Sequence, residues 1–83
     1  MRLNPLVMMR EEKDGTGIVF DPENNRALKL NRTGVVIWHA LEAGMDAGQT
    51  AGALMEAFDV NEETASADVA HFMQKLLDNS LSE

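Results

Sequence analysis

The sequence predicts an α+β fold in which a three-stranded antiparallel sheet precedes three helices. Short apolar runs separated by turn residues occupy positions 1–30, whereas apolar residues recur at helical spacing from Asn31 onward. The chain has 83 residues, which predicts a single domain over residues 1–83 with a small core. It has no cysteine, so neither disulfides nor a thiolate metal site can supplement that core.

The predicted strands cover residues 5–10, 17–20 and 26–30. A charged turn that ends in Gly15 joins the first two, and a turn containing Pro22 and Asn25 joins the next two. In the third strand, Leu28 and Leu30 face one way while the residues between and before them face the other. So small a sheet needs a helical layer against one face, which the rest of the chain supplies.

The predicted helices cover residues of about 32–43, 48–58 and 62–78. Asn31 and Asn61 are suitable N-caps for the first and third helices, and Gly44 is a suitable end for the first. Glu62 and Glu63 fall in the first turn of the third helix, where the helix dipole favours acidic residues. The order and lengths of these elements predict an arrangement like a winged helix-turn-helix with its sheet placed first.

The net charge of −7 is concentrated in the second half of the chain, where Lys75 is the one basic residue against nine acidic residues. An acidic third helix repels phosphate backbones, so we expect no nucleic-acid partner. No apolar run approaches the roughly 20 residues that span a bilayer, and the amino-terminal segment lacks the apolar core of a signal peptide. We therefore expect no membrane partner and a cytoplasmic location.

Catalysis is not indicated by any residue pattern in the chain. His39 and His71 are far apart in sequence, and neither belongs to a recognisable nucleophile-and-base or metal-ligand motif. No phosphate-binding or calcium-binding loop is present. We expect no enzymatic activity, no metal and no cofactor.

Two adjacent features of the pattern suggest a surface for a peptide. The third helix carries a stripe of Ala65, Val69, Phe72 and Leu76, and further apolar residues extend it round one flank, namely Ala70, Met73 and Leu77. This wide apolar arc indicates either packing against both sheet and helices or one wall of an open groove. The strand 26–30, if it lies at the sheet edge, could pair with an extended peptide, and its basic residues would favour acidic residues on that peptide. The alternative is an ordinary edge strand guarded by basic residues.

Residues 28–81 resemble the PqqD family, the group of pyrroloquinoline quinone biosynthesis protein D. The resemblance rests on Leu28-Lys-Leu30-Asn31-Arg-Thr33, on Ile37-Trp38 followed by Leu41, and on a third-helix pattern of Phe58-Asp59-Val60, Glu63, Asp68-Val69, Phe72 and Leu76-Leu77. It implies a RiPP recognition element, a non-catalytic domain that binds the leader segment of a ribosomally made precursor peptide. Such a domain presents the leader to a modifying enzyme, often a radical S-adenosylmethionine enzyme. The loop 44–50 and Asn79-Ser80-Leu81 depart from the family pattern.

The resemblance also implies where the leader binds, as a strand added to the third strand and packed against the third helix. The residues expected to bind it are Arg26, Ala27, Leu28, Lys29, Leu30, Ala65, Ser66, Val69, Ala70, Met73 and Leu77. Asp68 is expected to point to the opposite flank of the helix. A regulatory winged-helix domain or a scaffold that acts through protein contacts is the alternative function, and strand-mediated dimers are permitted but not required.

Overall fold

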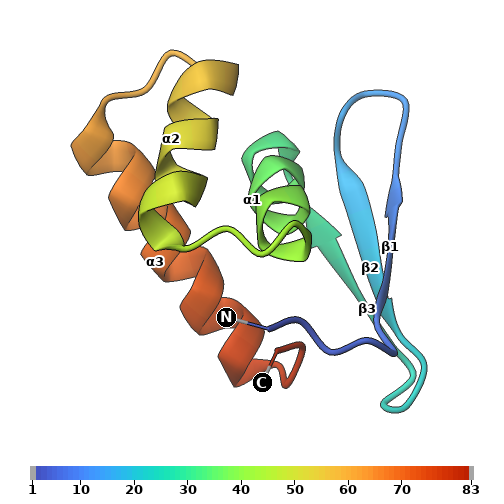
Figure 1. Cartoon of the computed structure of the whole chain (residues 1–83). Coiled ribbons are helices and arrows are strands. Elements are labelled where there is room, and N and C mark those ends of the chain that lie inside the picture. Colours follow the sequence, from blue (N-terminus) through green and yellow to red (C-terminus); the bar gives the residue numbers. More distant parts are fainter. Residues whose placement is uncertain (1, 83) are drawn as a thin grey trace.

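The computed structural model describes residues 2–82 and shows three strands followed by three helices (Figure 1). The strands are β1 (Met8–Glu11), β2 (Gly17–Asp21) and β3 (Arg26–Leu30). The helices are α1 (Arg32–Glu42), α2 (Ala47–Ala57) and α3 (Glu62–Asp78). The predicted element order and α+β class agree with this arrangement.

The sheet is an antiparallel meander of order β1-β2-β3, so β1 and β3 are its two edges. Its core face carries Val19 in register with Leu28, whereas Phe20 on the outer face is 40% exposed. β1 is shorter than predicted, because residues 5–7 do not join the sheet. The Asn4 side chain and carbonyl oxygen accept hydrogen bonds from the Leu6 and Val7 N–H groups (3.0 and 3.1 Å), which turns the chain before the strand begins.

The helix ends follow their capping residues. The Asn31 and Asn61 side chains each accept a hydrogen bond of 2.8 Å from a first-turn N–H group, as predicted. Gly44, in a left-handed conformation at φ +82°, follows the last turn of α1. α2 begins at Ala47 and not at the predicted residue 48, because Asp46 and Gln49 form a reciprocal capping box.

The carboxyl end of α3 is closed by a residue in the left-handed conformation, a role that glycine commonly plays at helix ends. The left-handed residue is Ser80, at φ +57°, whereas Asn79 has φ −101°. The Leu81 N–H group then donates to the Leu76 carbonyl oxygen at 2.9 Å, which closes the helix end. Leu81 itself is buried, so this turn returns the chain to the core.

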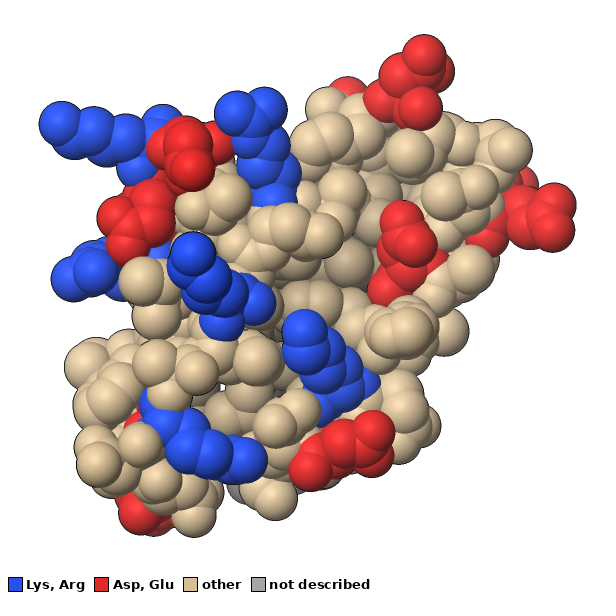
Figure 2. All heavy atoms as spheres, turned by 180° about the vertical axis from the view of Figure 1, so that it is seen from behind, with Lys and Arg blue, Asp and Glu red and all other residues tan. Residues whose placement is uncertain are grey.

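The core is organised around α1, which packs against β2, β3, α2 and α3 and separates the sheet from α3 (Figure 1). Ile37 and Trp38 of α1 are almost fully buried, and so is the predicted stripe of α3. Because α1 lies between them, the outer edge of β3 and one flank of α3 border an open space. Charge is unevenly distributed on the face in Figure 2, where Lys and Arg gather over the sheet and the centre, and Asp and Glu dominate the helical side.

Candidate functional site

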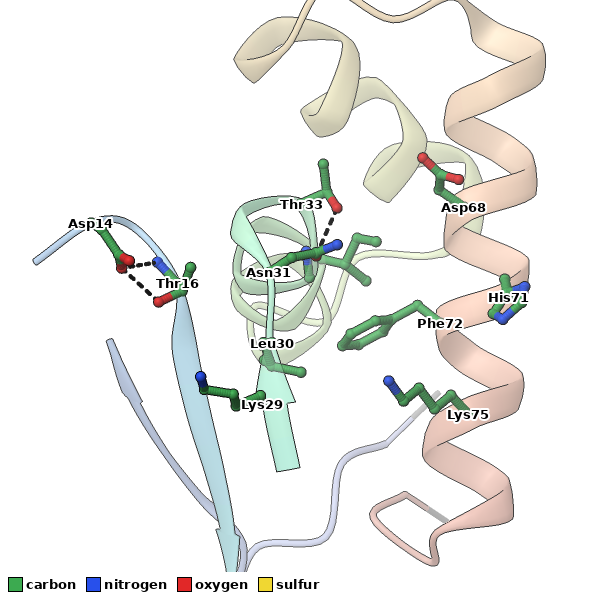
Figure 3. A pocket seen from close by; sticks show the side chains of 12 residues that line it. Asp14, Thr16, Lys29, Leu30, Asn31, Thr33, Asp68, His71, Phe72 and Lys75 are labelled. Atoms are coloured by element: carbon green, nitrogen blue, oxygen red, sulfur yellow. Dashed lines mark hydrogen bonds between the residues drawn. The ribbon is translucent and has the colours of Figure 1, made fainter. Parts of the chain in front are cut away.

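An open cleft of about 710 Å³ lies between β3 and α3 (Figure 3). β3 pairs with β2 along one edge, and within residues 2–82 its other edge pairs with no strand. The residues that line the cleft are Asp14, Thr16, Lys29, Leu30, Asn31, Thr33, Gly34, Ile37, Asp68, His71, Phe72 and Lys75. They come from the turn before β2, from the junction of β3 with α1, and from α3.

The floor of the cleft is apolar and depends on one glycine. Leu30, Ile37 and Phe72 are 3%, 1% and 9% exposed, so the floor also belongs to the core. A methyl group on Gly34 would lie 3.2 Å from a ring carbon of Phe72 and 3.2 Å from the Asn31 side-chain oxygen. The missing side chain therefore lets the first turn of α1 approach α3 while Asn31 still caps the helix.

Arg26 links the two elements that form the walls of the cleft, at a point outside its lining residues. Its guanidinium donates hydrogen bonds to the backbone oxygen and the side-chain oxygen of Asn79, so it joins the start of β3 to the end of α3. The same group lies 3.7 Å from the carboxylate of Asp21. A hydrogen bond from the Asn24 side chain lowers the pKa of Asp21, which keeps this buried carboxylate charged beside Arg26. Arg26 thus fixes the spacing between the two walls.

The rim of the cleft carries both signs of charge. Lys29 and Lys75 lie on opposite walls, and Asp68 lies nearer the start of α3 (Figure 3). Their side chains form no ion pair or hydrogen bond with any residue in the range 2–82. Asp14 differs, because its carboxylate accepts hydrogen bonds from the Thr16 hydroxyl and N–H groups (2.6 and 3.0 Å), which lower its pKa.

Comparison with known families identifies the family of the chain that forms this cleft. The family model described as Coenzyme PQQ synthesis protein D (PqqD) matches residues 16–81. The chain belongs to the PqqD family. The match includes β2, β3 and all three helices, and therefore every residue that lines the cleft except Asp14. No curated protein matches the chain significantly.

Solved structures with the same fold include two peptide-binding proteins. TbiB1, solved in complex with the TbiA(beta) leader peptide, has 22% sequence identity and a TM-score of 0.88, covering 100% of this chain and 95% of that chain. Lasso peptide synthetase B1, complexed with the leader peptide, has 23% identity and a TM-score of 0.85, covering 99% and 95%. These likenesses confirm the predicted fold for this PqqD-family chain.

The β3 residues of the predicted peptide-binding set divide between the cleft and a second, smaller hollow. Lys29 and Leu30 line the cleft. Arg26, Ala27 and Leu28 border a smaller hollow of about 40 Å³ between β3 and the end of α3. The prediction that β3 is an edge strand is confirmed within the described residues, and the role of these five residues in peptide binding stays a prediction.

The α3 half of the predicted set does not line the cleft. That half comprised Ala65, Ser66, Val69, Ala70, Met73 and Leu77. Two of them are buried core residues, at 0% and 1% exposure, and Met73 is half-buried against the same core. Ser66, Ala70 and Leu77 are exposed, but at 100° per residue they lie on the side of α3 turned away from β3.

The cleft wall is instead the polar side of α3, here called the cleft flank, which consists of Asp68, His71, Phe72 and Lys75. The opposite side, here called the apolar flank, consists of Ser66, Ala70, Met73 and Leu77. Asp68 does lie on the flank opposite Ala70, Met73 and Leu77, as expected, but this flank and not the apolar one lines the cleft. Apolar periodicity located the buried stripe but could not tell which side of it faces β3, because that depends on how α1 separates the sheet from α3. Lys75, the one basic residue of the second half of the chain, is the sequence feature that could have identified the flank facing β3.

Other polar clusters lie away from the cleft. His39 of α1 contacts the Glu11 carboxylate of β1 at 2.9 Å and Glu42 at 3.3 Å, and the Glu11 hydrogen bond raises the pKa of this histidine. In residues 2–82, no three histidine or acidic residues are grouped so that they could hold a metal ion. None of the described helices is both long and apolar enough to cross a membrane.

Proposed function

We propose that this PqqD-family chain is a non-catalytic binding protein for the leader segment of a ribosomally synthesised precursor peptide. The observation that carries the proposal is the unpaired edge of β3 beside an open cleft whose other wall is α3. An extended peptide could pair with the strand through its backbone and place alternate side chains in the cleft. The two similar structures described above are themselves complexes with leader peptides, which supports this choice of ligand.

The two edges of the sheet differ in a way that favours β3. At the β1 edge, Glu11 is engaged by His39 of α1, and Arg10 forms an ion pair of 3.2 Å with Glu12. Beside the β3 edge, by contrast, the cleft offers a buried apolar floor and charged side chains without partners among the described residues. A peptide on β3 would thus gain side-chain contacts that an equivalent peptide on β1 would lack.

A protein that binds the leader without modifying the precursor requires a second protein partner that carries out the modification. We propose that the domain presents the bound leader to an enzyme that modifies the rest of the precursor, in the cytoplasm where ribosomes release such peptides. A radical S-adenosylmethionine enzyme is the partner class that family membership suggests. In this role the domain contributes affinity and position, and the enzyme contributes the reactive groups.

A titration followed by amide chemical shifts tests the proposal. The probes are synthetic leader segments of precursor peptides encoded beside the gene for this chain, with a scrambled version of each as control. We expect saturable shifts at Lys29, Leu30, His71, Phe72 and Lys75, and none at β1 or α2. Failure of every leader to shift a folded sample, or saturable shifts centred on β1, would contradict the proposal. Shifts at β3 that depend on protein concentration alone would instead identify a second copy of the chain as the occupant.

A further inference from the structure

We infer that the outer face of the sheet, the face turned away from α1, is the docking surface for the modifying enzyme, which meets it with an apolar patch bordered by carboxylates. This inference rests on the proposed function but concerns a surface other than the cleft. It follows from the residues that the strand register places on this face, from their exposure and from their charge.

The outer face is more apolar than the solvated face of an antiparallel sheet usually is. The register places two rows of side chains on it, namely Met8, Phe20 and Ala27 in the first row and Arg10, Ile18 and Lys29 in the second. An antiparallel sheet with one solvated face normally alternates apolar residues inward with polar residues outward. Here four of the six outward residues are apolar, so the face departs from that rule.

The first row forms an exposed apolar patch. Met8 and Phe20 lie directly opposite each other in the pairing of β1 with β2, and they are 65% and 40% exposed. The described helices lie on the other side of the sheet, where α1 contacts β2 and β3, so they leave this patch open (Figure 1). Single exposed apolar residues are common, whereas adjacent ones on an uncovered face indicate a contact surface for a partner.

The second row determines the charge that suits such a partner. Arg10 and Lys29 lie on either side of Ile18, and Lys29 points away from α3 (Figure 3). Lys29 forms no ion pair within residues 2–82, and the pair that Arg10 forms with Glu12 is largely exposed and therefore weak. None of the six outward residues is acidic, and Lys and Arg gather over the sheet in Figure 2. Carboxylates on the partner would complement this row.

A second copy of the chain fits this face poorly. If two outer faces packed together, Arg10 and Lys29 of both copies would lie in or beside the interface without a carboxylate from either set of outward residues. Cations that lose water without gaining a partner oppose association. The face therefore favours a different protein as its occupant.

The position of the leader favours the modifying enzyme as that protein. A leader paired with β3 would place alternate side chains in the cleft, and its remaining side chains would continue the outer face beyond Ala27 and Lys29. An enzyme docked on the outer face would thus contact the domain and the leader side by side. Such an arrangement holds the precursor close to the reactive groups of the enzyme.

A matched pair of variants tests the docking surface. Phe20→Glu places a carboxylate in the apolar row, and Met55→Glu makes the same change in charge at an α2 residue of similar exposure, 38%. The probe is the purified modifying enzyme encoded beside the gene for this chain, titrated into fluorescently labelled domain saturated with a natural leader. We expect Phe20→Glu to weaken enzyme binding by roughly tenfold or more and Met55→Glu by less than about twofold, because only the first removes an aromatic contact and adds like-charge repulsion.

Leader affinity in the same variants separates this inference from the proposed function. Both variants should bind a natural leader as the parent domain does, because neither residue lines the cleft. If Phe20→Glu also loses leader binding, Phe20→Thr, which suits a strand, repeats the comparison against Met55→Thr.

Several outcomes would overturn the inference. If leaders bind but the enzyme binds both variants equally, or does not bind the parent domain, the docking surface is overturned and the proposed function stands. If no natural leader binds the folded parent domain, both fall together. A dimer in sedimentation that Phe20→Glu abolishes would make a second copy the occupant, and would overturn the inference as well.

Discussion

The two flanks of α3 are made by neighbouring residues of one helix, yet they have different surroundings. The cleft flank is the more polar, and it faces the unpaired edge of β3 over an apolar floor. The apolar flank looks more like a peptide-binding surface in the sequence, but Met73 already packs against the core and Leu77 faces away from β3 at 46% exposure. Apolar residues on a small domain are often needed for its own packing, because so little core is available. The position of a peptide groove on α3 therefore depends on which flank of the helix lies opposite the edge of β3, and the apolar character of a flank does not identify it.

The largest expected difference between the flanks is in stability. Phe72→Ala removes a ring that is 9% exposed and forms both core and cleft floor, so we expect the free energy of unfolding to fall by about 3 kcal/mol. Met73→Ala, on the half-buried apolar flank, should cost about 1 kcal/mol. Urea denaturation of both variants measures the difference. Equal losses would mean that the flanks are equally buried and would remove the contrast.

A bulky adduct can show which flank meets the peptide. The chain has no cysteine, so His71→Cys and Ala70→Cys each provide one labelling site, on the cleft flank and on the apolar flank respectively. After reaction with a large thiol reagent, the His71→Cys adduct should weaken leader binding by roughly tenfold or more, and the Ala70→Cys adduct by less than about twofold. The unlabelled variants control for the substitutions. The reverse order would restore the apolar flank as the peptide wall.

The two asparagine caps separate stability from binding. Asn31→Ala and Asn61→Ala each remove a side chain that accepts a 2.8 Å hydrogen bond from a helix N–H group, so each should cost about 1 kcal/mol in the free energy of unfolding. Asn31 lines the cleft, whereas Asn61 precedes α3 outside it. We expect weaker leader binding in the Asn31 variant alone, at a temperature where both variants remain folded. Equal affinities would indicate that this end of the cleft does not contact the leader.

The smallest effect concerns pH and lies at the opposite edge of the sheet. The hydrogen bond with Glu11, aided by Glu42, raises the pKa of His39 above its ordinary value of about 6.5. The folded state therefore favours protonated His39, and its stabilisation is complete below the unfolded pKa and lost as pH rises through the folded pKa. Because the pair is largely exposed, we expect only a few tenths of a kcal/mol between pH 5.5 and 8.5. His39→Gln should remove this difference, and an unchanged profile in that variant would contradict the assignment.

Local signals in the sequence predicted most of the fold because they act within a few residues. The Asn31 and Asn61 caps accept hydrogen bonds from nearby helix N–H groups. The alternation in β3 places every second side chain on the same face of the sheet. The misplaced starts of β1 and α2 also have local causes, in the hydrogen bonds of Asn4 and the Asp46–Gln49 capping box. For the candidate site, the β3 wall could be predicted, since strand order follows from short antiparallel connections.

By itself the sequence determined the α+β class, the caps, the buried stripe of α3 and the absence of a basic recognition helix, because periodicity, capping and charge are properties of short segments. Only the tertiary structure decided which flank of α3 meets β3. The two flanks of α3 lie on either side of the same buried stripe, so the stripe does not indicate which flank faces β3. That depends on the position of α1 between the sheet and α3 and on the contact that Gly34 permits with Phe72. Those contacts join residues far apart in the chain, so no local pattern encodes them.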